Sequence, residues 1–141
     1  MNGSGAGDGQ RDDSSSERTM ALGRLGENLA AAWYEERGYS LTDRNWRSRR
    51  GEIDLIAEKD NVLVICEVKS RAQARYGTPA EAVTPAKRHR LRLLATEWLA
   101  TRSGAGHPRD HKWYGEIRFD VACIVTGPGG RYTIDVIERA F

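Results

Sequence analysis

The sequence has little cysteine, little lysine and no long apolar run. Its two cysteines, Cys66 and Cys123, show neither the CxxC spacing of a zinc or redox motif nor the density of a disulfide-rich domain. No segment approaches the roughly 18 to 20 apolar residues that a membrane span needs, which excludes an integral membrane protein. Because no secretory signal with an apolar core is visible either, we expect a protein of the reducing cytoplasm.

Lysine is scarce, and arginine supplies 18 of the 22 basic residues. The planar guanidinium suits bidentate contacts with phosphate, although a net charge of +2 does not by itself indicate a polyanionic partner. Each lysine in this sequence is therefore a candidate for a special role.

The chain divides into a polar start and one domain. Residues 1–18 contain no large apolar side chain after Met1, which predicts a disordered tail over 1–18 and a single domain over 19–141. A helix capped by Thr19 and ended by Gly38 should follow, and then a strand over 39–45 and an arginine-rich loop over 47–50. The predicted buried stripe of this helix is Leu22, Leu25, Leu29 and Trp33.

The clearest β signal is a hairpin over 52–69. Apolar and polar residues alternate on both sides of Asp60-Asn61, and a two-residue turn there places the two apolar sets on one face. In this register Asp54 lies opposite Glu67, and Glu52 lies opposite Lys69.

The second half repeats the order of a helix and then strands. Thr84-Pro85 should begin a helix that buries Leu91, Leu94, Trp98 and Leu99 and stops before Gly104. A loop over 103–112, a strand over 117–125, a turn over 127–130 and a last strand from Tyr132 complete the pattern. This order predicts an α/β fold with a mixed sheet.

Three charged residues of the hairpin are the candidates for chemistry. The predicted register brings Asp54 and Glu67 to one sheet face, with Lys69 two positions along the same strand. Two adjacent carboxylates repel each other unless a cation lies between them, and hard oxygen ligands are typical of Mg²⁺ sites. This pattern points to hydrolysis of a phosphodiester.

The alternative is that these are ordinary cross-strand charges on a solvated sheet face. Ile56, Leu63 and Ile65 share that face, which favours a central, buried hairpin instead. Charges at one end of a buried sheet require a partner.

Two helical residues could complete the site. Glu27 lies on the small-residue side of the first helix, and Lys87 heads the apolar stripe of the second helix, where the helix dipole favours phosphate. A solvated glutamate and a lysine whose stem merely packs along the surface are the alternatives.

Basic segments surround these positions, over 37–50 and over 87–92. With Trp46 and Tyr76 nearby, they could form a groove that follows a phosphate backbone. The three histidines lack zinc spacing, and Asp120 is more readily explained as a structural partner of a neighbouring arginine.

Several motifs in this order and spacing resemble the YraN-like family. They are GEIDLIA over 51–57, Glu67-Val68-Lys69-x-Arg71, Gly26-Glu27, Arg44-Asn45-x-Arg47, Tyr76-Gly77, Lys87, Arg118-Phe119-Asp120-Val121 and the terminal Ala140-Phe141. The resemblance covers about residues 21–141. It implies a restriction-endonuclease-like three-layer core, a mixed β-sheet flanked by helices, similar to Holliday junction resolvases.

The resemblance also implies a PD-(D/E)XK site. Asp54 and Glu67 would be metal ligands, Val68 would offer its carbonyl, Lys69 would be the catalytic lysine, and Glu27 would add the carboxylate from the helix. Ile53 stands where the signature has proline. The residues that we expect to bind nucleic acid are Arg44, Arg47, Arg49, Arg50, Arg71, Lys87 and Arg88.

Three functions follow as hypotheses. The leading one is a nuclease that uses Mg²⁺ or Mn²⁺ to cut branched or otherwise structured DNA, with a homodimer suggested by analogy with resolvases. The second is a nucleic-acid-binding protein that keeps the fold without cleaving, and the third is a protein-interaction scaffold.

Overall fold

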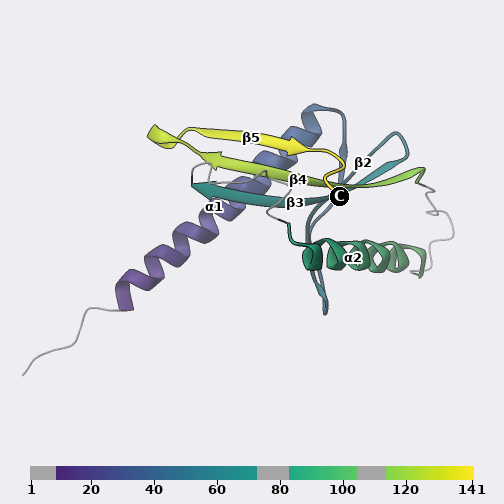
Figure 1. Ribbon diagram of the computed structural model, residues 1–141, viewed down its shortest axis with the longest axis horizontal. Coiled ribbons are helices and arrows are strands. Elements are labelled where there is room, and N and C mark those ends of the chain that lie inside the picture. The colour runs from purple at the N-terminus through teal and green to yellow at the C-terminus, as the bar shows by residue number, and fades with distance from the viewer. Residues whose placement is uncertain (1–8, 73–82, 105–113) are drawn as a thin grey trace, which may run out of the picture.

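A computed structural model describes residues 9–72, 83–104 and 114–141 (Figure 1). Five strands form one sheet in the order β1-β2-β3-β4-β5, in which β3 and β4 run parallel and the other neighbours run antiparallel. The elements are α1 (Gly9–Glu36), β1 (Ser40–Ser48), β2 (Gly51–Lys59), β3 (Val62–Ala72), α2 (Pro85–Gly104), β4 (Glu116–Thr126), the short 3₁₀ helix η2 (Pro128–Gly130) and β5 (Tyr132–Ile137).

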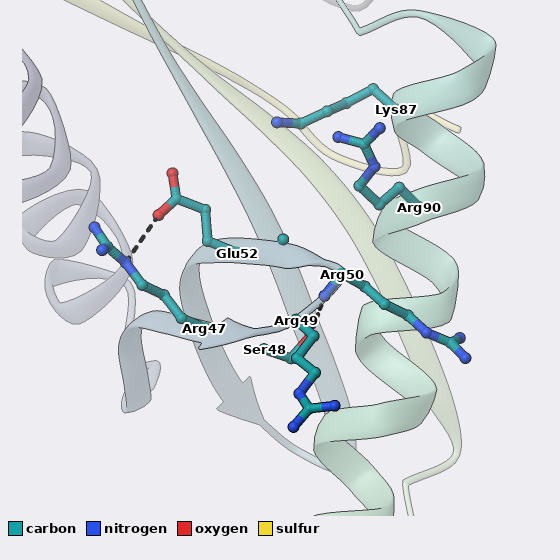
Figure 2. A pocket seen from close by; sticks show the side chains of 8 residues that line it. Arg47, Ser48, Arg49, Arg50, Glu52, Lys87 and Arg90 are labelled. Atoms are coloured by element: carbon teal, nitrogen blue, oxygen red, sulfur yellow. Dashed lines mark hydrogen bonds and ion pairs between the residues drawn. The ribbon is translucent and has the colours of Figure 1, made fainter.

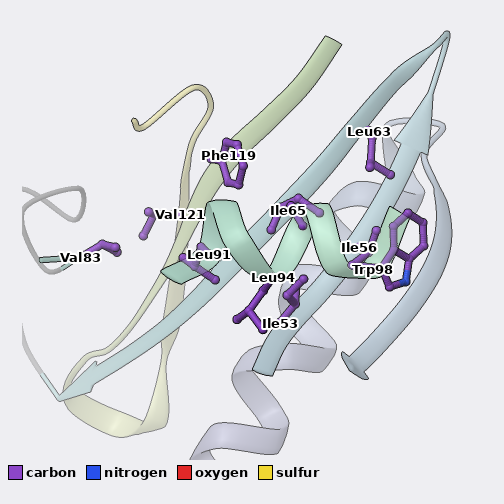
Figure 3. Close-up of a cluster of buried hydrophobic side chains, with 11 residues drawn as sticks. Ile53, Ile56, Leu63, Ile65, Val83, Leu91, Leu94, Trp98, Phe119 and Val121 are labelled. Carbon is purple, nitrogen blue, oxygen red and sulfur yellow. The ribbon is translucent and has the colours of Figure 1, made fainter. Parts of the chain in front are cut away.

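The two long helices cover opposite faces of the sheet and give the predicted three-layer α/β core. On one face α2 packs against β2, β3 and β4 through Leu91, Leu94 and Trp98, three members of its predicted stripe (Figure 3). On the other face α1 packs against the same three strands through Ala30, Ala31 and Tyr34. The central strands are therefore apolar on both sides, as expected for a sheet between two helical layers.

The predicted hairpin register is correct. Lys59 pairs with Val62, and the ladder continues to Leu55 opposite Cys66. The Asp60-Asn61 turn has positive φ at both residues, 50° and 64°, which is the backbone that a type I′ turn requires. Sequence alternation and turn chemistry therefore agree in this hairpin.

The buried face of α1 differs from the predicted one. Leu22, Leu25, Leu29 and Trp33 are only partly buried, whereas Gly26, Ala30, Ala31 and Tyr34 are buried. Small residues let the helix axis approach the sheet closely, so the larger side chains come to lie on the flanks of the contact.

Three predicted boundaries were wrong. The helix α1 begins at Gly9 and not at Thr19, so residues 9–18, which we expected in the tail, extend it beyond the sheet (Figure 1). Each further helical residue adds one hydrogen bond to an existing helix, so a polar extension needs no packing of its own. The strand β1 continues through Arg47 to Ser48, and α2 includes Gly104.

Some expectations fall outside the described residues. They concern residues 1–8, the Tyr76-Gly77 motif, and most of the loop predicted over 103–112, including two of the histidines. In the described part of the chain both cysteines are free, and neither helix is long and apolar enough to cross a membrane.

Candidate active site

Asp54 lies where two neighbouring strands separate. The β2–β3 ladder ends at Leu55 opposite Cys66, while the first residues of β2 stay paired with β1. Beyond the ladder, Oδ2 of Asp54 accepts a hydrogen bond from the backbone N–H of Val68 at 2.8 Å. The Asp54 side chain thus accepts the hydrogen bond of a β3 backbone N–H that the backbone of β2 no longer reaches.

Glu67 is a buried carboxylate held by two cations. Its side chain is 5% exposed, and its Oε1 lies 3.3 Å from Nζ of Lys87 and 3.5 Å from Nζ of Lys69. Its Oε2 is buried and has no hydrogen-bond partner among the described residues. Because an unpartnered buried carboxylate oxygen is costly, this atom is available to a ligand.

The two carboxylates act on each other electrostatically. Burial and then the charge of Glu67 raise the pKa of Asp54 to about 7, while the hydrogen bond from Val68 acts in the opposite direction. Glu27 and Glu52 raise this pKa further. Such mutual repulsion is what a bound cation relieves.

The β2–β3 ladder includes neither of the two opposed pairs that the hairpin register predicted, Asp54 with Glu67 and Glu52 with Lys69. Since the β2–β3 ladder ends before these pairs, Glu52 forms an ion pair with Arg47 of β1, with Oε2 and Nε 3.2 Å apart. Because β2 separates from β3 here, Glu52 pairs with Arg47 and not with Lys69.

Glu27 reaches the same region from α1. It lines a pocket of about 220 Å³ together with Asp54, Val68 and Ser70, and its Oε2 accepts a hydrogen bond from the side-chain amide of Asn45 at 3.0 Å. The hydroxyl oxygen of Ser70 is buried there without a hydrogen-bond partner in the described residues.

Gly26 explains how α1 comes so close to this pocket. A Cβ atom at this position would collide with the hydroxyl oxygen of Ser70. Glycine therefore permits the close approach that brings Glu27 over the ends of β2 and β3.

The donor set fits a divalent cation in part. Asp54 and Glu67 supply hard carboxylate oxygens, one of them unpartnered, and Mg²⁺ commonly binds through one or two carboxylates plus water and phosphate. No three His, Cys, Asp or Glu side chains of the described residues form a metal-binding group together. The predicted ligand roles of Asp54, Glu67, Val68 and Glu27 stay predictions.

The predicted nucleic-acid contacts separate into two groups. Arg47, Arg49, Arg50 and Lys87 line a second pocket, of about 500 Å³, between the β1–β2 turn and the start of α2 (Figure 2). The other three lie elsewhere: Arg44 donates to Asn28, Arg71 lies near the end of β3, and Arg88 donates to the carbonyl of Val83.

Arg90 lines this second pocket and was missed as a site residue. Its sequence signal was available, because Arg90 follows Lys87 by three residues and such residues share a helix face, whereas Arg88 does not share it. Gly51 also belongs to the pocket wall, where its positive φ of 144° favours glycine.

Asp120 belongs to a separate structural network. This fully buried carboxylate accepts hydrogen bonds from the guanidinium of Arg118 at 2.9 Å and from the hydroxyl of Tyr34 at 2.7 Å. Tyr34 lies two helical turns after Glu27 on α1, so the network fixes the helix that carries Glu27.

Comparison with known proteins gives one family. The profile of the uncharacterised protein family UPF0102, the YraN family, matches residues 26–124. A UPF0102 protein of Rhodococcus opacus is 48% identical over 122 residues, which cover 86% of this chain and 97% of the relative. UPF0102 proteins of Bifidobacterium longum and Clavibacter michiganensis are each 44% identical, over 85% and 87% of this chain and 92% and 98% of the relatives.

Proposed function

The chain belongs to the uncharacterised protein family UPF0102, and from this premise and the site geometry we propose that it is a metal-dependent nuclease for branched or otherwise structured DNA. One observation carries the proposal. At the fork of two strands the charge of the buried Glu67 raises the pKa of Asp54, and Glu67 itself has an unpartnered carboxylate oxygen and two lysines beside it.

The residues of the site have separable roles in this proposal. Asp54 and Glu67 would hold Mg²⁺ or Mn²⁺, which when bound supplies Lewis-acid polarisation of a phosphodiester oxygen. Lys69, whose side chain is about one-third exposed beside Glu67, is positioned to orient water or to stabilise negative charge on the reacting phosphate. Lys87 and the arginines of the second pocket would bind neighbouring phosphates.

The second candidate is a nucleic-acid-binding protein that does not cleave. It is favoured by the absence of a group of three metal-binding side chains among the described residues, since Glu27 is hydrogen-bonded to Asn45. A homodimer that cuts two symmetric strands stays a prediction from the resemblance to resolvases.

Cleavage assays distinguish the two candidates. The full chain would be incubated with junction, flap, single-stranded and duplex DNA in Mg²⁺ and in Mn²⁺, beside Asp54→Asn, Glu67→Gln and Lys69→Ala. We expect cleavage of a branched substrate by the wild type and by Asp135→Asn, an acid-to-amide control at an exposed position of β5. Cleavage that survives all three site substitutions would show that the activity does not arise from this site.

Calorimetric titration with Mn²⁺ tests the metal site without requiring turnover. Binding by the wild type and by Asp135→Asn, with loss of binding in Asp54→Asn, supports the proposed ligands. DNA binding with neither cleavage nor metal binding would favour the non-catalytic alternative.

A further inference from the structure

The pocket between the β1–β2 turn and α2 holds more positive charge than its own acids neutralise. Five cations line it, Arg47, Arg49, Arg50, Lys87 and Arg90, and the single acid among the described residues of its wall is Glu52. We call it the arginine pocket.

Three of these five cations are uncompensated. Arg47 is paired with Glu52 at 3.2 Å, and Lys87 is paired with Glu67 of the acidic pair at 3.3 Å. Within the described ranges, the side chains of Arg49, Arg50 and Arg90 form no ion pair. The excess positive charge favours an anion in this pocket, and a ligand with more than one negative charge gains most from it.

The geometry places two of the cations on one side of the pocket. Lys87 and Arg90 extend from α2 in the same direction, over the strand that carries Glu52 (Figure 2). The stem of Arg90 packs close to Gly51, where its Cδ would lie 3.3 Å from a Cβ atom, so a larger residue with this positive φ would be strained and would displace the arginine slightly.

The start of α2 adds to this attraction. Thr84 caps it by accepting a hydrogen bond from the N–H of Lys87, and the first turn of a helix carries partial positive charge. Both effects favour a phosphate beside Lys87 and Arg90.

We infer that the arginine pocket binds the terminal phosphate of a DNA strand and holds that end beside the acidic pair. This inference rests on the proposed function, which it narrows to structured DNA with a phosphorylated end, such as a nick or a flap. A terminal phosphate carries about two negative charges at neutral pH, whereas an internal phosphodiester carries one. Lys87 and Arg90, beside the N-terminus of α2, match the former better, and Arg49 and Arg50, which extend from the turn away from them (Figure 2), add to the positive charge around the site.

The position of Lys87 connects this pocket with the acidic pair. The same ammonium lines the arginine pocket and contacts Oε1 of Glu67. A strand end held by Lys87 and Arg90 is therefore placed directly beside Asp54 and Glu67, and Arg49 and Arg50 at the turn are placed to contact the nucleotides that follow.

Binding measurements in EDTA test the inference without any cleavage. Fluorescence anisotropy would compare one internally labelled single-stranded oligonucleotide with hydroxyl ends, with a 5′-phosphate and with a 3′-phosphate. We expect one phosphorylated form to bind about tenfold more tightly than the hydroxyl form, which corresponds to about 1.4 kcal/mol. The end that gives the preference identifies the polarity of the bound strand.

Variants locate the preference in the pocket. Arg90→Gln should reduce it to less than about twofold, whereas Arg131→Gln, the same change of charge at the exposed residue directly before β5, should leave it intact. Equal affinity for all three oligonucleotides overturns the inference, and so does a preference that Arg90→Gln and Arg49→Gln both retain.

This result is independent of the nuclease proposal. Asp54→Asn should keep the preference for a phosphorylated end, because Asp54 does not line the arginine pocket. A protein that binds phosphorylated ends but never cleaves would refute the nuclease proposal alone, and a nuclease without the preference would refute only the pocket assignment.

Discussion

Asp54 and Val68 are joined by a 2.8 Å hydrogen bond from a backbone N–H to a carboxylate, at the point where β2 separates from β3. This bond holds the aspartate in the fork although burial and Glu67 raise its pKa. The site thus keeps an acid in a position that is unfavourable for its charged form in the absence of metal.

The raised pKa of Asp54 predicts a pH-dependent stability. A pKa of about 7 in the folded, metal-free protein exceeds the ordinary value of 3.8, so the folded state favours the protonated acid. Its contribution to the free energy of unfolding is complete below about pH 4 and is lost as the pH rises through about 7. Asp54→Asn lacks this titration, so its stability relative to wild type should increase by a few kcal/mol over that range.

Urea unfolding in EDTA at several pH values measures this difference. Asp135→Asn is the matched control, and its stability should run parallel to that of the wild type. A constant offset between Asp54→Asn and wild type would show that Asp54 titrates normally.

The two lysines on Glu67 predict a non-additive effect on stability. Lys69→Met or Lys87→Met alone leaves one ammonium on the buried Oε1, so each should cost about 1 kcal/mol or less. The double variant leaves a buried carboxylate without a cation, and such losses cost about 3–5 kcal/mol.

A double-mutant cycle from urea unfolding provides the coupling energy. The excess cost of the double variant should disappear when Glu67→Gln is added, because no charge is then left unpaired. Additive costs for the two lysines would mean that Glu67 does not depend on them.

The contact between α1 and β3 predicts opposite effects for two glycines of the same helix. Gly26→Ala should lower the free energy of unfolding by about 1–3 kcal/mol, because the new Cβ meets the hydroxyl of Ser70. A Cβ atom at Gly23 would meet no described atom within 4 Å, so Gly23→Ala should stabilise the helix by up to about 1 kcal/mol.

Ser70→Ala is the rescue for this pair. The Ser70 hydroxyl has no partner within the described chain, so its removal should cost little by itself and should recover part of the Gly26→Ala loss. Equal losses in the single Gly26→Ala and the double variant would place the strain elsewhere.

The buried network around Asp120 predicts a ranking of two substitutions. Asp120→Asn removes the nearer of the two carboxylates paired with the buried Arg118, at 2.9 Å against 3.6 Å for the exposed Glu138, and should cost about 3–5 kcal/mol. Tyr34→Phe removes one hydrogen bond to Asp120, which remains bonded to Arg118, and should cost about 1.5–3 kcal/mol. Thermal or urea unfolding measures both values, and a larger loss for Tyr34→Phe would contradict the ranking.

The sequence by itself determined the features that depend on residues close to one another along the chain. Alternation of apolar residues and an Asp60-Asn61 turn set the β2–β3 register, and helical spacing identified the buried stripe of α2. These signals are local, because side-chain periodicity and turn dihedrals follow from the chain within a few residues.

Only the tertiary structure decided which face of α1 is buried, where β2 leaves β3, and that the β1–β2 turn forms a pocket with the start of α2. The physical reason is that each depends on how closely distant segments approach. Gly26 and Gly51 permit two such approaches, and no pattern of neighbouring residues records the distance between a helix and a strand.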